Sequence, residues 1–181
     1  MSETLPLVLI VVVVAVVLAA IAYAAWQRKR SNELRARFGP EYDHTVQQRG
    51  RRRAAENELR QREQEHARLD LRALSAQQLA GYREEWADVQ QQFVDDPDRA
   101  VRRADELAGR IMADRGYPTH NFEEGAAQVS VDHPDVVQRY RAAHSLAIEH
   151  EQGQPTTEEL RRSVTAYRSL VEVLLDDGQQ E

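Results

Sequence analysis

The chain opens with a run of uncharged, mostly apolar side chains from residue 5 to residue 26, LPLVLIVVVVAVVLAAIAYAAW. The basic residues Arg28, Lys29 and Arg30 follow it almost directly. As a helix, the 22 residues of this run would measure roughly 33 Å, enough to cross a hydrocarbon core of about 30 Å. The pattern predicts an N-terminal transmembrane helix, with residues 1–26 as a membrane anchor.

Two other interpretations of this segment fit its pattern less well. A signal peptide begins with basic residues and has a shorter apolar centre, whereas this chain begins with MSET. Alanines at positions 20, 22 and 24 do resemble a cleavage site, so removal of the segment stays open. A buried helix of a soluble domain has a polar face, and this run has none.

The charges that flank the apolar run predict its orientation. Basic residues crowd only its C-terminal side, at positions 28, 29, 30, 35 and 37. By the positive-inside rule, the N-terminus lies outside the cell and the rest of the chain is cytoplasmic. The expected location is therefore the inner or plasma membrane, crossed once, with the lipid bilayer as one partner.

Beyond the anchor, apolar positions recur at three- and four-residue spacing, which predicts helices throughout, and glycine and proline fall at the breaks. Residues 27–44 are expected to be a basic juxtamembrane helix that ends in a turn at FGPEYD, residues 38–43. Residues 45–74 carry many charges and few apolar positions, which predicts a helical stalk. Residues 75–178 contain four stronger amphipathic patterns and form the expected folded domain.

Capping signals mark where two of the four amphipathic helices begin. Ser75 with Gln78, and Thr156 with Glu159, have the spacing of capping boxes. Residues 117–131 contain proline and glycine and are expected to be a long irregular connection. The predicted fold class is all-α: a transmembrane helix, a charged helical stalk and an antiparallel bundle of about four helices.

The formal charge is unevenly distributed along the chain. Residues 27–72 carry 13 basic and 8 acidic side chains, whereas residues 73–181 carry 11 basic and 21 acidic ones. Contact of the basic part with anionic lipid is expected through its arginine cluster, and a solvated charged helix explains the same charges equally well. The arginines of this cluster are Arg49, Arg51, Arg52 and Arg53. Nucleic acid is not an expected partner, because the cluster lacks aromatic residues that stack on bases.

The residue types restrict the chemistry of the chain. Cysteine is absent, which excludes disulfides, thiolate metal sites and thiol catalysis. His144 and His150 are six residues apart and so point in different directions on a helix, unlike the two histidines of H-E-x-x-H. Asp132 and Asp135 suit the start of a helix. We expect neither a metal nor another cofactor.

Four segments resemble an uncharacterised bacterial family of single-pass membrane proteins that is frequent in actinobacteria. These segments are FGPEYD at residues 38–43, WADVQQQFVDDP at 86–97, ADRGYP at 113–118 and SVDHPDVVQRYRAAH at 130–144. The resemblance covers most of the chain after the anchor. It implies membership of that family, and it supplies no established activity or site residue.

The sequence favours a membrane-anchored binding or adaptor module. Aromatic residues beside charges in loops are typical of interaction surfaces, which makes six residues of the two predicted turns our candidates. They are Phe38, Tyr42, Asp43, Arg115, Tyr117 and Pro118.

Two other functions stay open at this point. One is a small enzyme with a pocket under the loop at residues 117–131 and with His120, Glu123 or His133 as acid–base groups. The other is a stalk or assembly subunit of a membrane complex, with a long self-associating helix.

Overall fold

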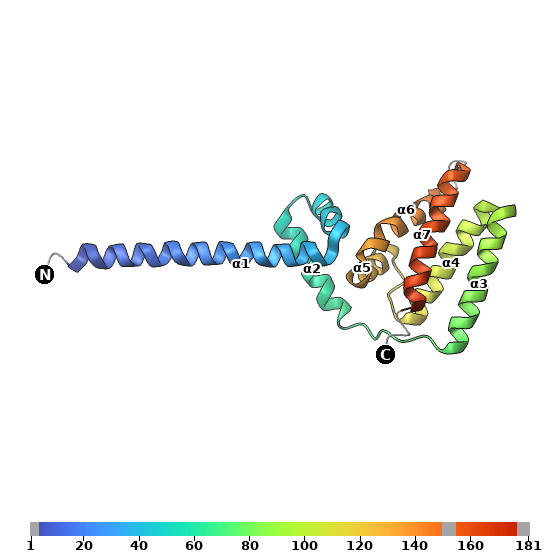
Figure 1. Cartoon of the computed structure of the whole chain (residues 1–181), viewed down its shortest axis with the longest axis horizontal. Helices are drawn as coiled ribbons and strands as arrows, with labels where there is room; N and C mark the ends of the chain where they lie inside the picture. Colours follow the sequence, from blue (N-terminus) through green and yellow to red (C-terminus); the bar gives the residue numbers. More distant parts are fainter. Residues whose placement is uncertain (1–3, 150–154, 177–181) are drawn as a thin grey trace. The chain divides into compact units, whose positions relative to one another are not determined.

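The computed structural model describes residues 4–149 and 155–176, with side chains for residues 13–148 and 155–176. The described residues form seven α-helices and no strand. They divide into two compact units, Met1–Arg37 and Phe38–Glu181. Figure 1 shows the helices in sequence colours. The prediction of an all-helical chain is confirmed.

The first helix, α1, extends from Thr4 to Arg49 and is interrupted at Gly39, where φ is 46° and ψ is −123°. A positive φ is accessible to glycine because it has no Cβ. Pro40 follows at the start of the second helical part, where its missing N–H costs nothing. The predicted turn at residues 38–43 is therefore a sharp break at a single residue, after which the helix resumes.

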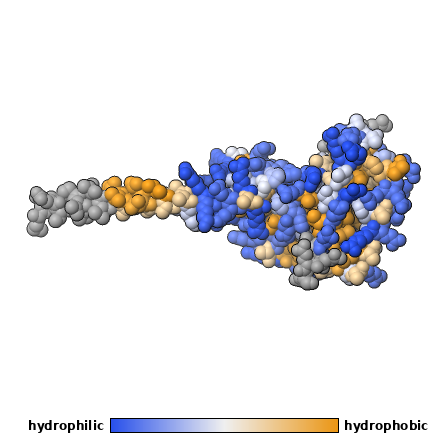
Figure 2. All heavy atoms as spheres, in the orientation of Figure 1, coloured by the Kyte–Doolittle hydropathy of each residue, from blue (hydrophilic) through white to orange (hydrophobic). Residues whose placement is uncertain are grey.

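The first unit, Met1–Arg37, is helical from Thr4 onward. Eight of its large apolar side chains are at least half exposed: Val13, Val14, Val16, Val17, Leu18, Ile21, Tyr23 and Trp26. Figure 2 shows this stretch in orange.

The predicted transmembrane helix is not supported. Among the described residues, no helix is both long enough and apolar enough to cross a membrane. The fold class is therefore corrected to all-α, with no membrane-spanning helix among the residues that the structure describes.

The second unit, Phe38–Glu181, contains the end of α1 and six further helices. They are α2 (Arg52–His66), α3 (Ala76–Asp95), α4 (Pro97–Arg115), α5 (Phe122–Asp132), α6 (Pro134–Glu149) and α7 (Thr157–Asp176). The packed pairs are α3 with α4, α4 with α7, α7 with α6, α6 with α5, and α5 with α2. The predicted helical bundle is confirmed.

The core of the bundle follows the apolar stripes of its helices. Leu107 and Ile111 of α4 and Tyr167, Leu170 and Leu174 of α7 are completely buried. Each set repeats at three or four residues, which places its members on one face. The capping boxes at Ser75 and Thr156 are present, so the starts of α3 and α7 were predicted correctly.

The prediction of an irregular connection at residues 117–131 is wrong, because residues 122–132 form α5. Asn121 caps this helix by accepting a hydrogen bond from the Glu124 N–H at 3.3 Å. Gly125, which argued against a helix, lets the backbone of Pro118 approach: a Cβ at position 125 would lie 2.6 Å from the Pro118 carbonyl oxygen.

The segment predicted as a stalk packs within the second unit. Ala55 and Leu59 of α2 are completely buried, and α2 lies against α5. Gly50, with a φ of 65°, allows the chain to reverse between α1 and α2. These two apolar residues lie one helical turn apart and so share one face of α2. The buried ion pair between Arg62 and Glu41 adds to their contact with the rest of the unit.

Candidate functional site

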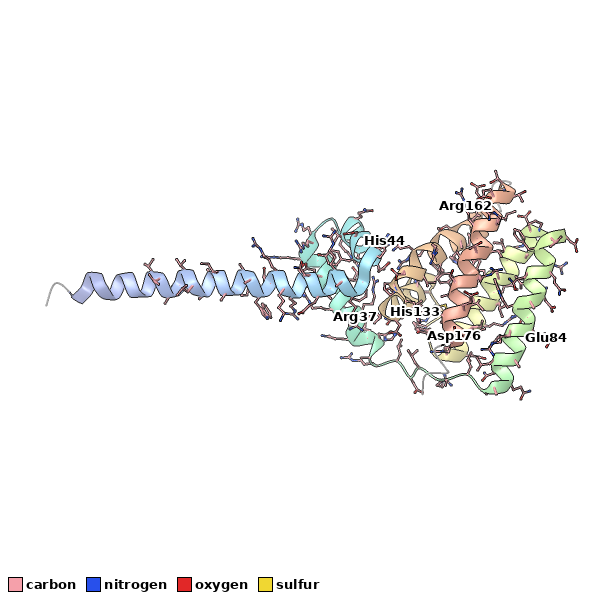
Figure 3. The ribbon with its side chains drawn as sticks, in the orientation of Figure 1. Arg37, His44, Glu84, His133, Arg162 and Asp176 are labelled. Carbon is pink, nitrogen blue, oxygen red and sulfur yellow. The ribbon has the colours of Figure 1, made fainter. Side chains whose placement is uncertain are left out.

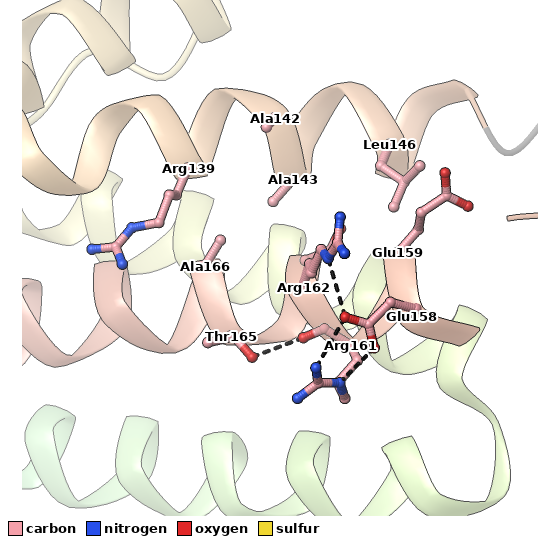
Figure 4. Close-up of a pocket in the computed structure, with 11 residues that line it drawn as sticks. Arg139, Ala142, Ala143, Leu146, Glu158, Glu159, Arg161, Arg162, Thr165 and Ala166 are labelled. Carbon is pink, nitrogen blue, oxygen red and sulfur yellow. Dashed lines mark hydrogen bonds and ion pairs between the residues drawn. The ribbon is translucent and has the colours of Figure 1, made fainter. Parts of the chain in front are cut away.

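A groove lies open between α6 and α7, with a cavity volume of about 540 Å³ (Figure 4). Ala142 and Ala143 of α6 and Ala166 of α7 give it a floor of small side chains. Its other lining residues are Arg139, Leu146, Glu158, Glu159, Arg161, Arg162, Ser163 and Thr165. We call this set of residues the α6/α7 groove.

The sequence of the two helices explains why a groove forms here. Arg139, Ala142, Ala143 and Leu146 are spaced i, i+3, i+4 and i+7, so they share one face of α6. Alanine at the contact lets two helices pack closely but leaves the space above it unfilled. The result is a shallow apolar channel with long polar side chains at its edges.

Arginine dominates the edge of the groove. Arg161 and Arg162 both bind Glu158, with Nε to carboxylate distances of 2.9 Å and 3.1 Å. The hydrogen bonds from Arg161 and Arg162 lower the pKa of the Glu158 carboxyl. Arg162 is marked near the amino-terminal end of α7 in Figure 3.

Two further charges complete the edge. Glu159 belongs to the capping box of α7, where its carboxylate accepts a hydrogen bond from the Thr156 N–H at 2.7 Å. Arg139 is exposed and makes no ion pair or hydrogen bond with any described residue. The groove thus has three arginines and two glutamates, in a unit (Phe38–Glu181) that carries 19 basic and 28 acidic residues.

A polar and aromatic cluster centres on Asp105 of α4. The Asp105 carboxylate of α4 accepts a hydrogen bond from the Tyr167 hydroxyl at 2.9 Å and lies 2.8 Å from Nδ1 of His144. The His144 ring stacks on Phe122 with 3.5 Å between the ring centroids. Burial raises the pKa of Tyr167, and the charge of Asp105 raises it further. This cluster joins α4, α5, α6 and α7.

A second polar cluster centres on Glu41, whose side chain is completely buried. Arg62 and Arg141 each donate a hydrogen bond to its carboxylate at 2.6 Å, and the Gln138 amide donates another at 2.5 Å. Arg62 also donates to Ser130 at 3.0 Å.

These contacts belong to a longer row of alternating charges. Glu58 pairs with Arg62 and with Arg49, and Glu123 pairs with Arg141. We call the row Arg49, Glu58, Arg62, Glu41, Arg141 and Glu123 the charge chain. Its members come from α1, α2, α5 and α6, so it ties the 38–66 segment to the bundle.

Three of the six predicted interaction residues lie at the break in α1. Phe38 is completely buried and Tyr42 is 3% exposed, while Asp43 is exposed. The Tyr42 hydroxyl donates a hydrogen bond to Glu56 at 3.0 Å and accepts one from Arg52 at 2.9 Å. The two aromatic side chains therefore pack inside the protein.

The other three lie at the C-terminal end of α4 and directly after it. Arg115 donates a hydrogen bond to the Leu174 carbonyl at 2.8 Å, at the end of α7, and is buried. The Tyr117 hydroxyl donates to Asp132 at 3.5 Å and is also buried, and Pro118 is half-buried. The interaction role of these six residues stays a prediction.

Gly116 explains the shape of this junction. It ends α4 with a φ of 93°, and a Cβ on it would lie 2.4 Å from the Asp70 carbonyl oxygen. The Arg72 N–H donates to the Arg115 carbonyl at 2.9 Å beside it. The ADRGYP segment therefore holds the loop after α2 against the end of α4.

The acid–base candidates of the enzyme alternative lie in separate pairs. His120 lies 2.8 Å from Glu124, and Glu123 is 3.1 Å from Arg141. The His133 N–H donates to the Val129 carbonyl at the end of α5. His66 lies 2.9 Å from Asp132, within ion-pair distance but outside hydrogen-bond geometry. In the part of the chain that the structure describes, no three histidine or acidic side chains gather where they would hold a metal ion.

Sequence reasoning missed Glu41 and the groove. Glu41 stands in the conspicuous FGPEYD segment, but a glutamate beside a turn is usually exposed. The i, i+3, i+4, i+7 spacing from Arg139 to Leu146 was visible, and the alanines within it indicated a shallow contact rather than a filled core.

Comparisons of the chain with protein-family models, with curated proteins and with solved structures found no match.

Proposed function

We propose that this protein is a helical binding module that docks a partner protein in the α6/α7 groove. The observation that carries the proposal is the groove itself, a cavity of about 540 Å³ with an alanine floor and an arginine edge. Its volume falls in the range of about 300–1,000 Å³ that is common for ligand sites. A groove between two helices is also the usual seat of a docked helix.

The polar side chains outside the groove favour binding over catalysis. Glu41 binds both Arg62 and Arg141, and Asp105 is shared by His144 and Tyr167. A catalytic group needs to reach a substrate, whereas these groups hold helices together. The binding-module proposal therefore takes precedence over the enzyme alternative.

Position-specific photo-crosslinking in cells that naturally make the protein tests this proposal. A photoreactive amino acid replaces Ala142, which lines the groove and is exposed, and in a matched control it replaces Ala87, which is exposed on α3. We expect a discrete crosslinked product from position 142 that position 87 does not give. The product should disappear when Leu146→Glu places a charge in the groove. No product from position 142, or the same product from both positions, would contradict the proposal.

A second candidate function is contact with an anionic lipid surface through the first unit. Large apolar side chains of residues 13–26 are exposed, and Arg28, Lys29 and Arg30 follow them. Apolar side chains bury area in the interfacial layer, and nearby basic residues add about 1 kcal/mol each toward anionic lipid. This candidate concerns contact with the surface alone.

Vesicle co-sedimentation tests the lipid contact. The full chain should sediment with vesicles that contain phosphatidylserine and less with vesicles of phosphatidylcholine only. Replacing Arg28, Lys29 and Arg30 with glutamine should remove this difference, whereas Arg83→Gln on α3 should not. Equal sedimentation with both kinds of vesicle would count against a role for the basic residues.

A further inference from the structure

We infer that the partner segment in the α6/α7 groove is a short amphipathic helix with an acidic side chain, and that Arg139 binds this carboxylate. The inference rests on the proposed function and adds the chemistry of the partner. Three features of the groove support it: the pattern of its floor, its length and the charges at its edge.

The floor matches the contact face of a helix. The α6 residues of the groove are spaced i, i+3, i+4 and i+7, and α7 presents Arg162 and Ala166 four residues apart. The alanines among these positions let the backbone of a third helix approach closely. The cavity volume of about 540 Å³ holds the side chains of one face of such a helix rather than the whole helix.

The length of the groove limits the length of the partner. The distance along α6 from Arg139 to Leu146 is seven residues, or about 10 Å at the helical rise. This span corresponds to two turns of a docked helix, which offers three or four apolar side chains at i, i+3, i+4 and i+7. A segment of about 8–12 residues is therefore sufficient.

The edge charges select an acidic partner. Arg139 is unpaired among the described residues, and Arg161 and Arg162 share the single carboxylate of Glu158. The groove thus has a local excess of positive charge, although the unit around it has nine more acidic than basic residues. Arginine binds a carboxylate with two parallel hydrogen bonds, which fixes both position and direction.

Selection of peptides on the full-length protein tests the inference. A display library of random 12-residue peptides is selected on the wild-type chain after depletion on the full-length variant Ala142→Trp. Ala142 is exposed, so the tryptophan blocks the groove without entering the core. Depletion removes peptides that bind elsewhere, including those that bind the exposed apolar helix of the first unit.

We expect the enriched peptides to carry an Asp or Glu together with apolar residues at three- and four-residue spacing. Their affinity should fall about tenfold in Arg139→Gln, equivalent to about 1.4 kcal/mol, because the charge-assisted hydrogen bonds to the carboxylate are lost. Arg139→Lys should lose less, because it keeps the charge. Arg168→Gln is the matched control, because Arg168 is exposed on α7 outside the groove, and its affinity should equal that of the wild type.

Two results overturn the inference, and they differ in what they say of the proposed function. Enriched peptides without acidic residues, or affinities within twofold in Arg139→Gln, would reject the acidic partner and leave the groove as a binding site. Failure to enrich any peptide that distinguishes the wild type from Ala142→Trp would reject the groove itself. Thermal unfolding monitored by circular dichroism should give the same midpoint for the wild type and the exposed-site variants.

Discussion

The Glu41 carboxylate accepts a hydrogen bond from Arg62 at 2.6 Å where water has almost no access, since Glu41 is completely buried and the Arg62 side chain is 7% exposed. Glu41 follows the break in α1, and Arg62 lies in α2. Arg141 of α6 binds the other carboxylate oxygen at 2.6 Å. One buried carboxylate therefore connects α1 and α2 to α6, which is distant from them in sequence.

Removing this carboxylate should destabilise the protein strongly. In Glu41→Gln the side chain keeps its shape, but Arg62 and Arg141 lose the charge that compensates for their burial. Breaking a buried ion pair from one side costs about 3–5 kcal/mol. We expect a loss of this size in the free energy of unfolding, measured by urea denaturation.

The matched control for Glu41→Gln is Glu84→Gln. Glu84 is exposed on α3, so its substitution should change the unfolding free energy by no more than about 0.5 kcal/mol. Equal urea midpoints for the two variants would show that the buried carboxylate contributes little, and that apolar contacts alone hold the 38–66 segment.

The charge chain also predicts a response to acid. Burial raises the pKa of the Glu58 carboxyl, but its hydrogen bonds and the charges of Arg49 and Arg62 outweigh burial and lower the pKa overall. A lowered folded-state pKa stabilises the protein above the unfolded value of about 4.3, and this contribution is lost as the pH falls through the folded value. Glu58→Gln should therefore weaken the protein at pH 7, and the difference from the wild type should shrink as the pH falls below about 4.

Urea denaturation of both proteins at a series of pH values measures this effect. Glu106→Gln is the control, because Glu106 is exposed on α4 and should not change the pH dependence. A difference between Glu58→Gln and the wild type that stays constant down to the lowest pH would contradict an electrostatic role for Glu58.

The four helices α3, α4, α6 and α7 were predictable because each has a strong local signal. The capping boxes at Ser75 and Thr156 and the apolar stripes behind them identify α3 and α7 without tertiary information. The helix α5 was missed because Gly125 lies near its start, and glycine usually marks a break. Position 125 requires glycine because the Pro118 backbone approaches it closely, a contact that only the folded chain reveals.

The candidate site was less predictable than the fold. Charged residues such as Glu41, Arg62 and Arg141 are usually exposed. Here Glu41 and Arg62 are buried because Glu41 forms ion pairs with both arginines in the folded chain. Phe38 and Tyr42 were expected in a turn, whereas the break at Gly39 directs them into the protein. Arg139 is an ordinary surface arginine in the sequence, and it becomes a candidate ligand-binding residue only beside the alanine floor of the groove.

Tyr82 should affect stability at high pH. Burial and the hydrogen bond to Asp114, 2.7 Å long, raise the pKa of the Tyr82 hydroxyl to about 12. Because the folded-state pKa is raised, the contribution of Tyr82 to stability is complete below the unfolded-state pKa of about 10. This contribution is lost as the pH rises through the folded-state pKa. In Tyr82→Phe, the loss of stability between about pH 10 and 12 should be smaller than in the wild type.

Unfolding midpoints at pH 8 and pH 11 provide the comparison for Tyr82. Tyr23 is the control, because it is 59% exposed, and Tyr23→Phe should leave the difference between the two midpoints unchanged. If Tyr82→Phe and the wild type lose the same stability over this range, the hydrogen bond to Asp114 does not couple the Tyr82 proton to folding.

Substitution by alanine should have opposite effects on stability at Gly109, inside α4, and at Gly116, which ends α4. At Gly116, φ is 93° and the new Cβ would meet the Asp70 carbonyl oxygen at 2.4 Å, so Gly116→Ala should cost about 2 kcal/mol or more. At Gly109, inside α4, a Cβ meets no atom within 4 Å, so Gly109→Ala should stabilise the protein by about 0.5–1 kcal/mol. Thermal unfolding of both variants measures the contrast. A harmless Gly116→Ala would mean that the loop at residues 70–72 moves away from the end of α4 at little cost, and the junction formed by ADRGYP would then not be rigid.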